Sequence, residues 1–227
     1  MEEQHPHDRQ ENHDSPVEVR VVVFSLQEKK LQALFVPEDH ADPGTRWTIP
    51  GMAVIGCPSL ECIASECLST YTNQHESYLE QLYTYSSPER GIISIVYFAL
   101  VPQIAITTAR QERPKQARWF PIDTPLLLVG DHAEILGYAL RRLRYKLEYT
   151  AVGFDLLPEN FSLSELQATY EIILGEKLDK RNFRRRILKA NIIEPTPHQR
   201  AGEGRPARLF RYRHDAVAEV KTRRLFP

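Results

Sequence analysis

"SLSELQATYEIILGEKLDKRNFRRRILKANIIEPT", Ser162 to Thr196, contains the pattern that decides the fold of the C-terminal part. Ser162 and Glu165 have the spacing of a capping box and predict the start of a helix. Gly175 is a natural C-cap for that helix. Shortly after it, Asp179 predicts the N-cap of a second helix. Two helices joined by so short a turn indicate a helix-turn-helix.

The second predicted helix has one apolar side and one basic side. Phe183 and Ile187 mark the side that faces the domain. Basic residues and an asparagine recur on roughly the opposite side, at Arg181, Asn182, Arg185 and Lys189. Such a helix can set arginine against guanine and asparagine against adenine in a major groove. A solvated face without a partner is the alternative, because basic helices are common.

A wing is predicted after the second helix. "IIEP" (Ile192–Pro195) and "ARLFRYR" (Ala207–Arg213) have the composition of two strands, and the Gly-rich, basic "TPHQRAGEGRP" lies between them. Within this loop, Gly204-Arg205-Pro206 is similar to short segments that place an arginine in a narrow A·T-rich minor groove. The residues predicted to contact DNA are Lys180, Arg181, Asn182, Arg184, Arg185, Lys189, Arg200, Arg205 and Arg208.

Charge is distributed unevenly between the two halves of the chain. The formal net charge of the whole chain is −1. From Asn160 to the end, 15 Lys and Arg face 8 Asp and Glu, so this part is near +7 and the remainder near −8. A basic module fused to an acidic one suggests that only the C-terminal part binds a polyanion.

The N-terminal part begins with strands. "VEVRVVVFSL" (Val17–Leu26) and "LQALFV" (Leu31–Val36) are rich in β-branched residues, and the polar "QEKK" between them predicts a hairpin or meander. Further strands are predicted at Tyr78–Ser86, Gly91–Val101 and Gln116–Ile122. One helix, with Pro58 and Ser59 at its start, is predicted from an apolar stripe at Leu60, Ile63, Ala64, Cys67, Leu68 and Tyr71.

A closing helix is predicted from about His132 to Tyr149, with Asp131 and Glu134 as a capping box. "AVGFDLLPENF" after it is predicted to be a linker packed by its apolar residues, and Pro158 prevents a continuous helix. The predicted fold class is therefore α+β. Its expected divisions are a disordered tail at 1–16, a strand-rich domain at 17–150 and a winged helix at 151–227.

The strand-rich domain resembles a Nudix domain, an α/β/α sandwich around a mixed sheet. The resemblance lies in the spacing of Trp47, Pro50, Gly51, Val54, Ser59, Leu60, Glu61, Ala64, Leu68 and Thr72. Nudix hydrolysis needs carboxylates on consecutive helical turns to hold Mg²⁺ against a diphosphate. The sequence departs from the family at Met52, Pro58, Glu66, Cys67, Thr70 and Tyr71. Thiol, hydroxyl and phenol are poor Mg²⁺ ligands, so no cofactor is expected and the domain is expected to be inactive.

The whole chain resembles the Nudix-related transcriptional regulators of the NrtR type, bacterial repressors of NAD or sugar metabolism. The resemblance extends from "WTIPG" (Trp47–Gly51) through the long block at Phe161–Thr196 to "GRPARLFRY" (Gly204–Tyr212). It implies a homodimer that binds double-stranded, palindromic operator DNA and responds to a small effector, either ADP-ribose or a sugar-type metabolite. Candidate effector contacts, chosen because aromatic rings and arginines suit nucleotides and sugar phosphates, are Arg46, Trp47, Arg90 and Glu112.

Two other functions stay open. The first is an active Nudix hydrolase of ADP-ribose or a related nucleoside diphosphate, with relocated ligands such as Glu61, Glu66 and Glu112. The second is an adaptor that acts through proteins. The tail histidines His5, His7 and His13 could bind a metal weakly, although a flexible run of histidines is mostly just solvated.

Three cysteines, Cys57, Cys62 and Cys67, match no zinc spacing and fit a reduced, cytoplasmic setting. No apolar run reaches the length of a membrane span, so no membrane association is expected.

Overall fold

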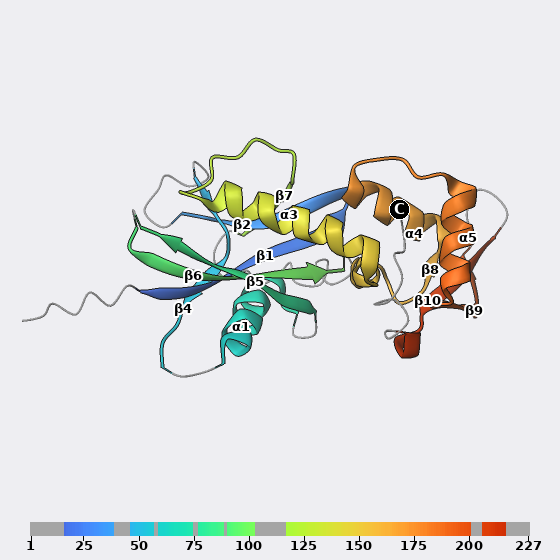
Figure 1. Ribbon diagram of the computed structural model, residues 1–227, viewed down its shortest axis with the longest axis horizontal. Helices are drawn as coiled ribbons and strands as arrows, with labels where there is room; N and C mark the ends of the chain where they lie inside the picture. The colour runs from blue at the N-terminus through green and yellow to red at the C-terminus, as the bar shows by residue number, and fades with distance from the viewer. Residues whose placement is uncertain are drawn as a thin grey trace, which may run out of the picture.

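The computed structural model describes residues 16–38, 46–56, 59–74, 77–88, 90–102, 117–200 and 206–216. In Figure 1, a strand-rich domain lies at one end of an elongated molecule and a small helical domain at the other. None of the described helices is long and apolar enough to cross a membrane. The predicted tail at 1–16 lies almost wholly outside the described residues, since only Pro16 belongs to them.

Seven described strands form the large sheet, with β3-β2-β1-β6-β5 as its main order, β4 beside β1 and β7 beside β2. β1 and β6 are parallel, while the other described pairs are antiparallel, so the sheet is mixed as predicted. The strands are β1 (Val17–Gln27), β2 (Lys30–Pro37), β3 (Trp47–Thr48), β4 (Gly51–Ala53), β5 (Tyr78–Ser87), β6 (Ile92–Val101) and β7 (Arg118–Pro121).

A two-residue turn joins β1 to β2 and confirms the predicted hairpin. Both turn residues have positive φ, 50° at Glu28 and 60° at Lys29. This is the backbone of a turn whose twist matches paired strands, and it is usually formed by Asn and Gly. The strands therefore impose the turn here, because neither Glu nor Lys favours that conformation.

One helix covers each face of the sheet (Figure 1). Helix α1 (Leu60–Thr72) buries Ile63, Ala64, Cys67 and Leu68 against one face, and its predicted N-cap is confirmed because Ser59 Oγ accepts from the Cys62 N–H at 3.2 Å. Helix α3 (His132–Tyr149) covers the other face. Alternate residues of β1 point to opposite faces, so Val19, Val21 and Val23 pack with α1 whereas Val22 and Phe24 pack with α3.

The predicted capping box of α3 is wrong. Asp131 makes no side-chain hydrogen bond to the first turn of the helix. Its carboxylate instead accepts from Ser87 Oγ at 3.5 Å and from Tyr85, which raises the pKa of Tyr85 to about 12. Two side chains from the end of β5 thus compete successfully with the local cap.

The C-terminal domain is a winged helix. Its capping box at Ser162 and Glu165, its C-cap Gly175 (φ 78°) and its second N-cap Asp179 are confirmed. The sheet order is β8-β10-β9, and the two-residue strand β8 was not predicted. The elements are η2 (Val152–Leu156), β8 (Phe161–Ser162), α4 (Leu163–Leu174), α5 (Lys180–Ala190), β9 (Ile193–Arg200), β10 (Ala207–Tyr212) and η3 (His214–Ala216).

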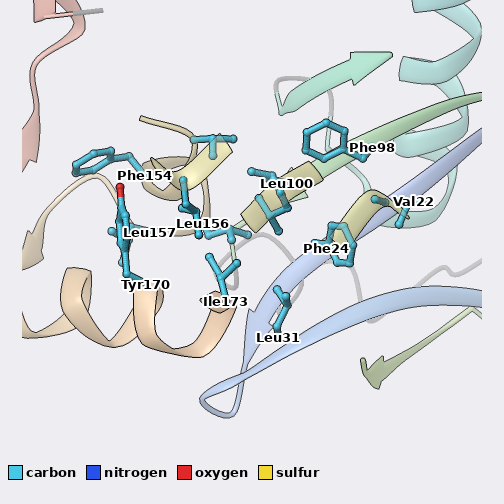
Figure 2. Close-up of a cluster of buried hydrophobic side chains, with 14 of the residues drawn as sticks. Val22, Phe24, Leu31, Phe98, Leu100, Phe154, Leu156, Leu157, Tyr170 and Ile173 are labelled. Carbon is cyan, nitrogen blue, oxygen red and sulfur yellow. The ribbon is translucent and has the colours of Figure 1, made fainter. Parts of the chain in front are cut away.

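A continuous apolar core joins the two domains. The same cluster of buried residues contains Phe24 and Leu100 of the large sheet, Leu156 of η2, and Tyr170 and Ile173 of α4. Figure 2 shows these side chains between the strands of the large sheet and helix α4. The prediction that this segment is packed by its apolar residues is therefore confirmed, because Val152, Phe154, Leu156 and Leu157 belong to the same core.

Candidate DNA-binding surface and effector site

Helix α5 exposes its basic side. Phe183 and Ile187 are buried against the domain, as predicted. The opposite side carries exposed cationic side chains at Arg181, Arg185 and Lys189, and Lys180 is exposed at the start of the helix. The helix starts at Asp179, whose Oδ1 accepts from the Asn182 N–H at 2.7 Å, so the side chain that ends the turn also fixes the first residues of the basic face.

Glu171 of α4 fixes the turn between the two helices. Its Oε1 accepts from the Leu178 N–H at 3.1 Å and from Gln167 Nε2 at 2.9 Å, while its Oε2 accepts from Lys177 Nζ at 2.8 Å. Gln167 Nε2 also donates to the Leu178 carbonyl at 3.0 Å. The hydrogen bond from Lys177, together with those from Gln167 and Leu178, lowers the pKa of Glu171 to about 2. The carboxylate thereby fixes the turn that leads from α4 into α5.

Three of the predicted DNA-binding residues of α5 form hydrogen bonds within the protein. Arg184 Nη2 donates to Ser164 Oγ at 3.1 Å, which ties α5 to the first turn of α4. Arg185 Nη2 donates to Asn182 Oδ1 at 2.7 Å. An asparagine that pairs with adenine uses both its carbonyl and its amide, so the bond from Arg185 must open before Asn182 can read a base in this way.

The predicted wing is present, and its first strand is longer than expected, because β9 continues to Arg200. Arg200 forms an ion pair with Glu165 and donates to the Asn160 carbonyl at 3.2 Å, so it ties the wing to the start of α4. Arg208 lies exposed, with its guanidinium 5.9 Å from the centre of the Phe210 ring. Arg205 lies outside the described residues.

Arg46 and Trp47, two of the candidate effector contacts, are placed very differently. Arg46 is exposed and its Nε lies 3.3 Å from Glu38 Oε2. Trp47 is only 4% exposed and packs edge to face on Phe120, with 4.7 Å between ring centres. The guanidinium carbon of Arg118 lies over the Trp47 ring, 5.7 Å from its centre. The indole therefore acts as a core anchor in this conformation.

Arg90, the third candidate, is exposed beside the loop that leads into α3. Its Cδ lies 3.7 Å from the position that a side chain on Gly130 would occupy. Arg90 lies close enough to lower the pKa of Glu18 and of His132. Trp47 also pairs with Leu128, so Trp47 and Arg90 both border the segment that precedes α3. Glu112, the fourth candidate, lies outside the described residues.

A buried polar network beneath the loop at 48–51 was not predicted. Arg20 donates to both carboxylate oxygens of Glu18 at 2.7 Å, to the Ile49 carbonyl at 2.6 Å and to Thr48 Oγ1 at 2.9 Å. Burial alone raises the pKa of Glu18, but the hydrogen bonds and charge of Arg20, with a hydrogen bond from Ser94 Oγ, bring it below its ordinary value. The sequence of β1 contains one signal for this network. Side chains alternate between the two faces of a strand, so Glu18 and Arg20 lie on the same face as the apolar Val22 and Phe24.

His132 closes this network from the side of α3. Its Nδ1 accepts from the Ile49 N–H at 3.1 Å and lies 3.0 Å from Thr48 Oγ1. Burial, followed by the positive charges of Arg20 and Arg90, lowers the pKa of His132 to about 3. The neutral imidazole thus serves as an acceptor that holds the loop, and Gly51 packs so closely on Arg20 that an added Cβ would lie 3.1 Å from the guanidinium carbon.

The Nudix helix α1 offers a poor setting for a divalent cation. Cys67 is buried in the core, and burial raises the pKa of its thiol to about 12. Thr70 Oγ1 donates to the Glu66 carbonyl at 2.8 Å. Glu61 and Glu66 are exposed, and a spacing of five residues places them ~140° apart around the helix. Among the residues that the structure describes, no group of three or more His, Cys, Asp or Glu side chains is arranged to hold a metal.

A Nudix-like domain that carries a winged helix with a basic recognition helix defines a class of transcriptional regulators. Residues 153–212 match the family model of the NrtR DNA-binding winged helix domain. Over 202 residues the chain is 31% identical to a protein of Acinetobacter baylyi named ADPR responsive transcriptional repressor NtrR, with 86% of this chain and 80% of the relative covered. The chain belongs to the NrtR family of transcriptional regulators, which confirms the resemblance inferred from the sequence.

Solved structures agree with this assignment. The crystal structure of Shewanella oneidensis NrtR complexed with a 27mer DNA is similar with a TM-score of 0.76 and 28% identity, covering 92% of this chain and 96% of that chain. A MutT/nudix family protein from Enterococcus faecalis shares the fold, with a TM-score of 0.68 at 18% identity. The predicted fold class, a Nudix-like mixed-sheet domain followed by a winged helix, is therefore confirmed.

Proposed function

We propose that the protein is a homodimeric repressor that binds a palindromic operator and releases or tightens its hold on DNA when a small metabolite binds the Nudix-like domain. The carrying observation is the exposed basic face of α5 beside the wing. In a symmetric dimer, two such helices would meet two half-sites about one helical turn apart. Residues 151–227 form the DNA-binding domain, and the protein acts in the cytoplasm.

Residues 17–150 form the effector domain, with Arg46, Trp47, Arg90 and Glu112 as the candidate contacts. ADP-ribose is the first effector to test, because a relative with 31% identity is named as responsive to it. Arg90 is the best supported of the four, since it is exposed and lies next to the loop that Arg20 and His132 hold. Trp47 would contribute indirectly, through the position of that loop.

The Nudix-like domain is proposed to bind its effector without hydrolysing it. The positions of the usual helical ligands carry the buried Cys67, the exposed Thr70 and the half-buried Tyr71. Incubation of ADP-ribose with the protein and Mg²⁺ or Mn²⁺ is expected to release no AMP above a protein-free control. Release that rises with protein concentration would contradict this part of the proposal.

Fluorescence anisotropy with DNA from upstream of the protein's own gene tests the proposed function directly. The titration is made at two salt concentrations, with and without ADP-ribose. Specific binding that weakens as salt rises is expected, because phosphate contacts release counterions. ADP-ribose should shift the apparent Kd, since an effector acts through unequal affinity for two states. Salt-insensitive or sequence-independent binding would favour the adaptor function instead.

A further inference from the structure

The exposed face of helix α5 also carries an apolar side chain, Leu188. Leu188 is 52% exposed, although Phe183 and Ile187 already supply the apolar contacts that fix the helix to its domain. By helical spacing, Leu188 lies one turn beyond Arg184 and Arg185 on the same side of the helix. Leu188 therefore belongs to the same surface as the cations that are proposed to meet DNA.

The surroundings of Leu188 favour one kind of partner. Arg181, Arg184, Arg185 and Lys189 lie within two helical turns of it. An apolar protein surface that covered Leu188 would have to remove water from these cations without replacing it, which is costly. A major groove offers phosphates to the cations and, on its floor, one apolar group, the 5-methyl of thymine.

The position of Leu188 on the winged helix also favours DNA as its partner. Arg184 reaches Ser164 in the first turn of α4, and Arg200 links that turn to the wing. The side of α5 that carries Leu188 is thus continuous with the two other elements by which winged helices approach a duplex. A side chain located there would face the groove when the cations contact the backbone.

We propose that Leu188 is a specificity-determining residue that packs on the 5-methyl group of a thymine in each half-site of the operator. This inference rests on the proposed DNA-binding function. It adds a contact that recognises a base by an apolar group, beside the hydrogen bonds that Arg and Asn can make. This contact distinguishes thymine from uracil, because the two bases differ only by that methyl group.

The test begins with a duplex selected from a random-sequence pool on the full-length protein. Each thymine of the selected duplex is then replaced by uracil, one position per duplex, which keeps base pairing and every hydrogen-bonding group. Binding is measured by anisotropy for the parent protein, for Leu188→Ala and for Leu127→Ala. Leu127 is a matched control, because it is 63% exposed and lies in the Nudix-like domain. Alanine is compatible with a helix, so Leu188→Ala is expected to fold.

The parent protein should lose about fourfold in affinity at one thymine per half-site, the factor that corresponds to burial of one methyl group. Leu188→Ala should bind the thymine duplex about fourfold more weakly and show no further loss with uracil. Leu127→Ala should behave as the parent does. Equal sensitivity of the parent and Leu188→Ala to uracil would overturn the inference, as would a parent protein indifferent to every replacement.

Two other outcomes are informative. If Leu188→Ala alters the dimer in sedimentation experiments while keeping the thymine preference, Leu188 contacts a second protomer and the inference is wrong. If no duplex is enriched from the pool, the proposed DNA-binding function itself fails. The two failures are therefore distinguishable.

Discussion

Acidification should weaken the folded protein through a single buried imidazole. His132 is 2% exposed, and its Nδ1 accepts a hydrogen bond from the Ile49 N–H. Its pKa falls from the ordinary 6.5 to about 3 in the folded protein. In the unfolded chain His132 is therefore protonated as the pH falls through 6.5, whereas in the folded chain it is protonated only near pH 3. The stability that neutral His132 contributes is complete above pH 6.5 and is lost progressively as the pH falls towards 3.

The size of this effect follows from the two pKa values. At pH 5 the unfolded chain is protonated at this position and the folded chain is not, which costs about 2 kcal/mol relative to neutral pH. His132→Asn removes the titration and offers an amide oxygen near the place of Nδ1. The variant should be less stable than the parent at pH 7, but its free energy of unfolding should fall by about 2 kcal/mol less between pH 7 and pH 5.

Urea unfolding at pH 7, 6 and 5, followed by tryptophan fluorescence, measures this difference. The two tryptophans, Trp47 and Trp119, both lie in the Nudix-like domain that contains the Ile49 hydrogen bond. His198→Asn makes the same substitution at an exposed position in the wing and serves as the matched control. If the parent and His132→Asn lose equal stability between pH 7 and pH 5, the assignment of His132 as a buried neutral acceptor is refuted.

Three further predictions concern the winged helix and its link to the sheet. The double variant Arg181→Ala, Arg185→Ala should weaken operator binding by ~1–3 kcal/mol for each arginine that pairs with a guanine. Anisotropy at several salt concentrations measures this loss, and an affinity equal to that of the parent would contradict the DNA-facing role of α5. Ser162→Ala removes the cap of α4 and should lower the free energy of unfolding by about 1 kcal/mol in urea, whereas no change would mean that the capping box is dispensable. Phe154→Ala, in η2, should lower the free energy of unfolding by ~3 kcal/mol or more, and tryptophan fluorescence should report this loss although both tryptophans lie in the other domain. An unfolding curve, followed by fluorescence, that equals that of the parent would mean that the domains unfold independently.

Elements that depend on local pattern were predictable from the sequence. Helix α4 begins and ends at its predicted caps and α5 begins at its predicted N-cap, because Ser162, Gly175 and Asp179 each act on backbone groups within a few residues. Strand β1 was predictable because its β-branched run is long. Strand β8 was missed because two residues show no period. The cap at Asp131 was predicted wrongly because partners from β5, more than 40 residues away, outcompete the local backbone.

Features of the candidate site that depend on distant partners were not predictable. Arg20 and His132 are separated by more than a hundred residues, yet they bind the same two-residue segment of the loop, Thr48 and Ile49. Arg200 was predicted as a DNA contact from its place in a basic wing, and the structure adds its ion pair with Glu165. No pattern within the wing indicates that an acidic residue of α4 lies beside it.

Helix α3 connects the loop at 48–51 to the winged helix, and this places a physical constraint on how the two domains communicate. At its start, His132 accepts from Ile49; near its end, Arg144 Nε donates to the Ile173 carbonyl of α4 at 2.8 Å. Eighteen residues of helix span about 27 Å, and the core beneath is continuous from Phe24 to Tyr170. An effector that shifts the loop at Ile49 can therefore change DNA affinity only if this packed unit has a second arrangement that the effector prefers.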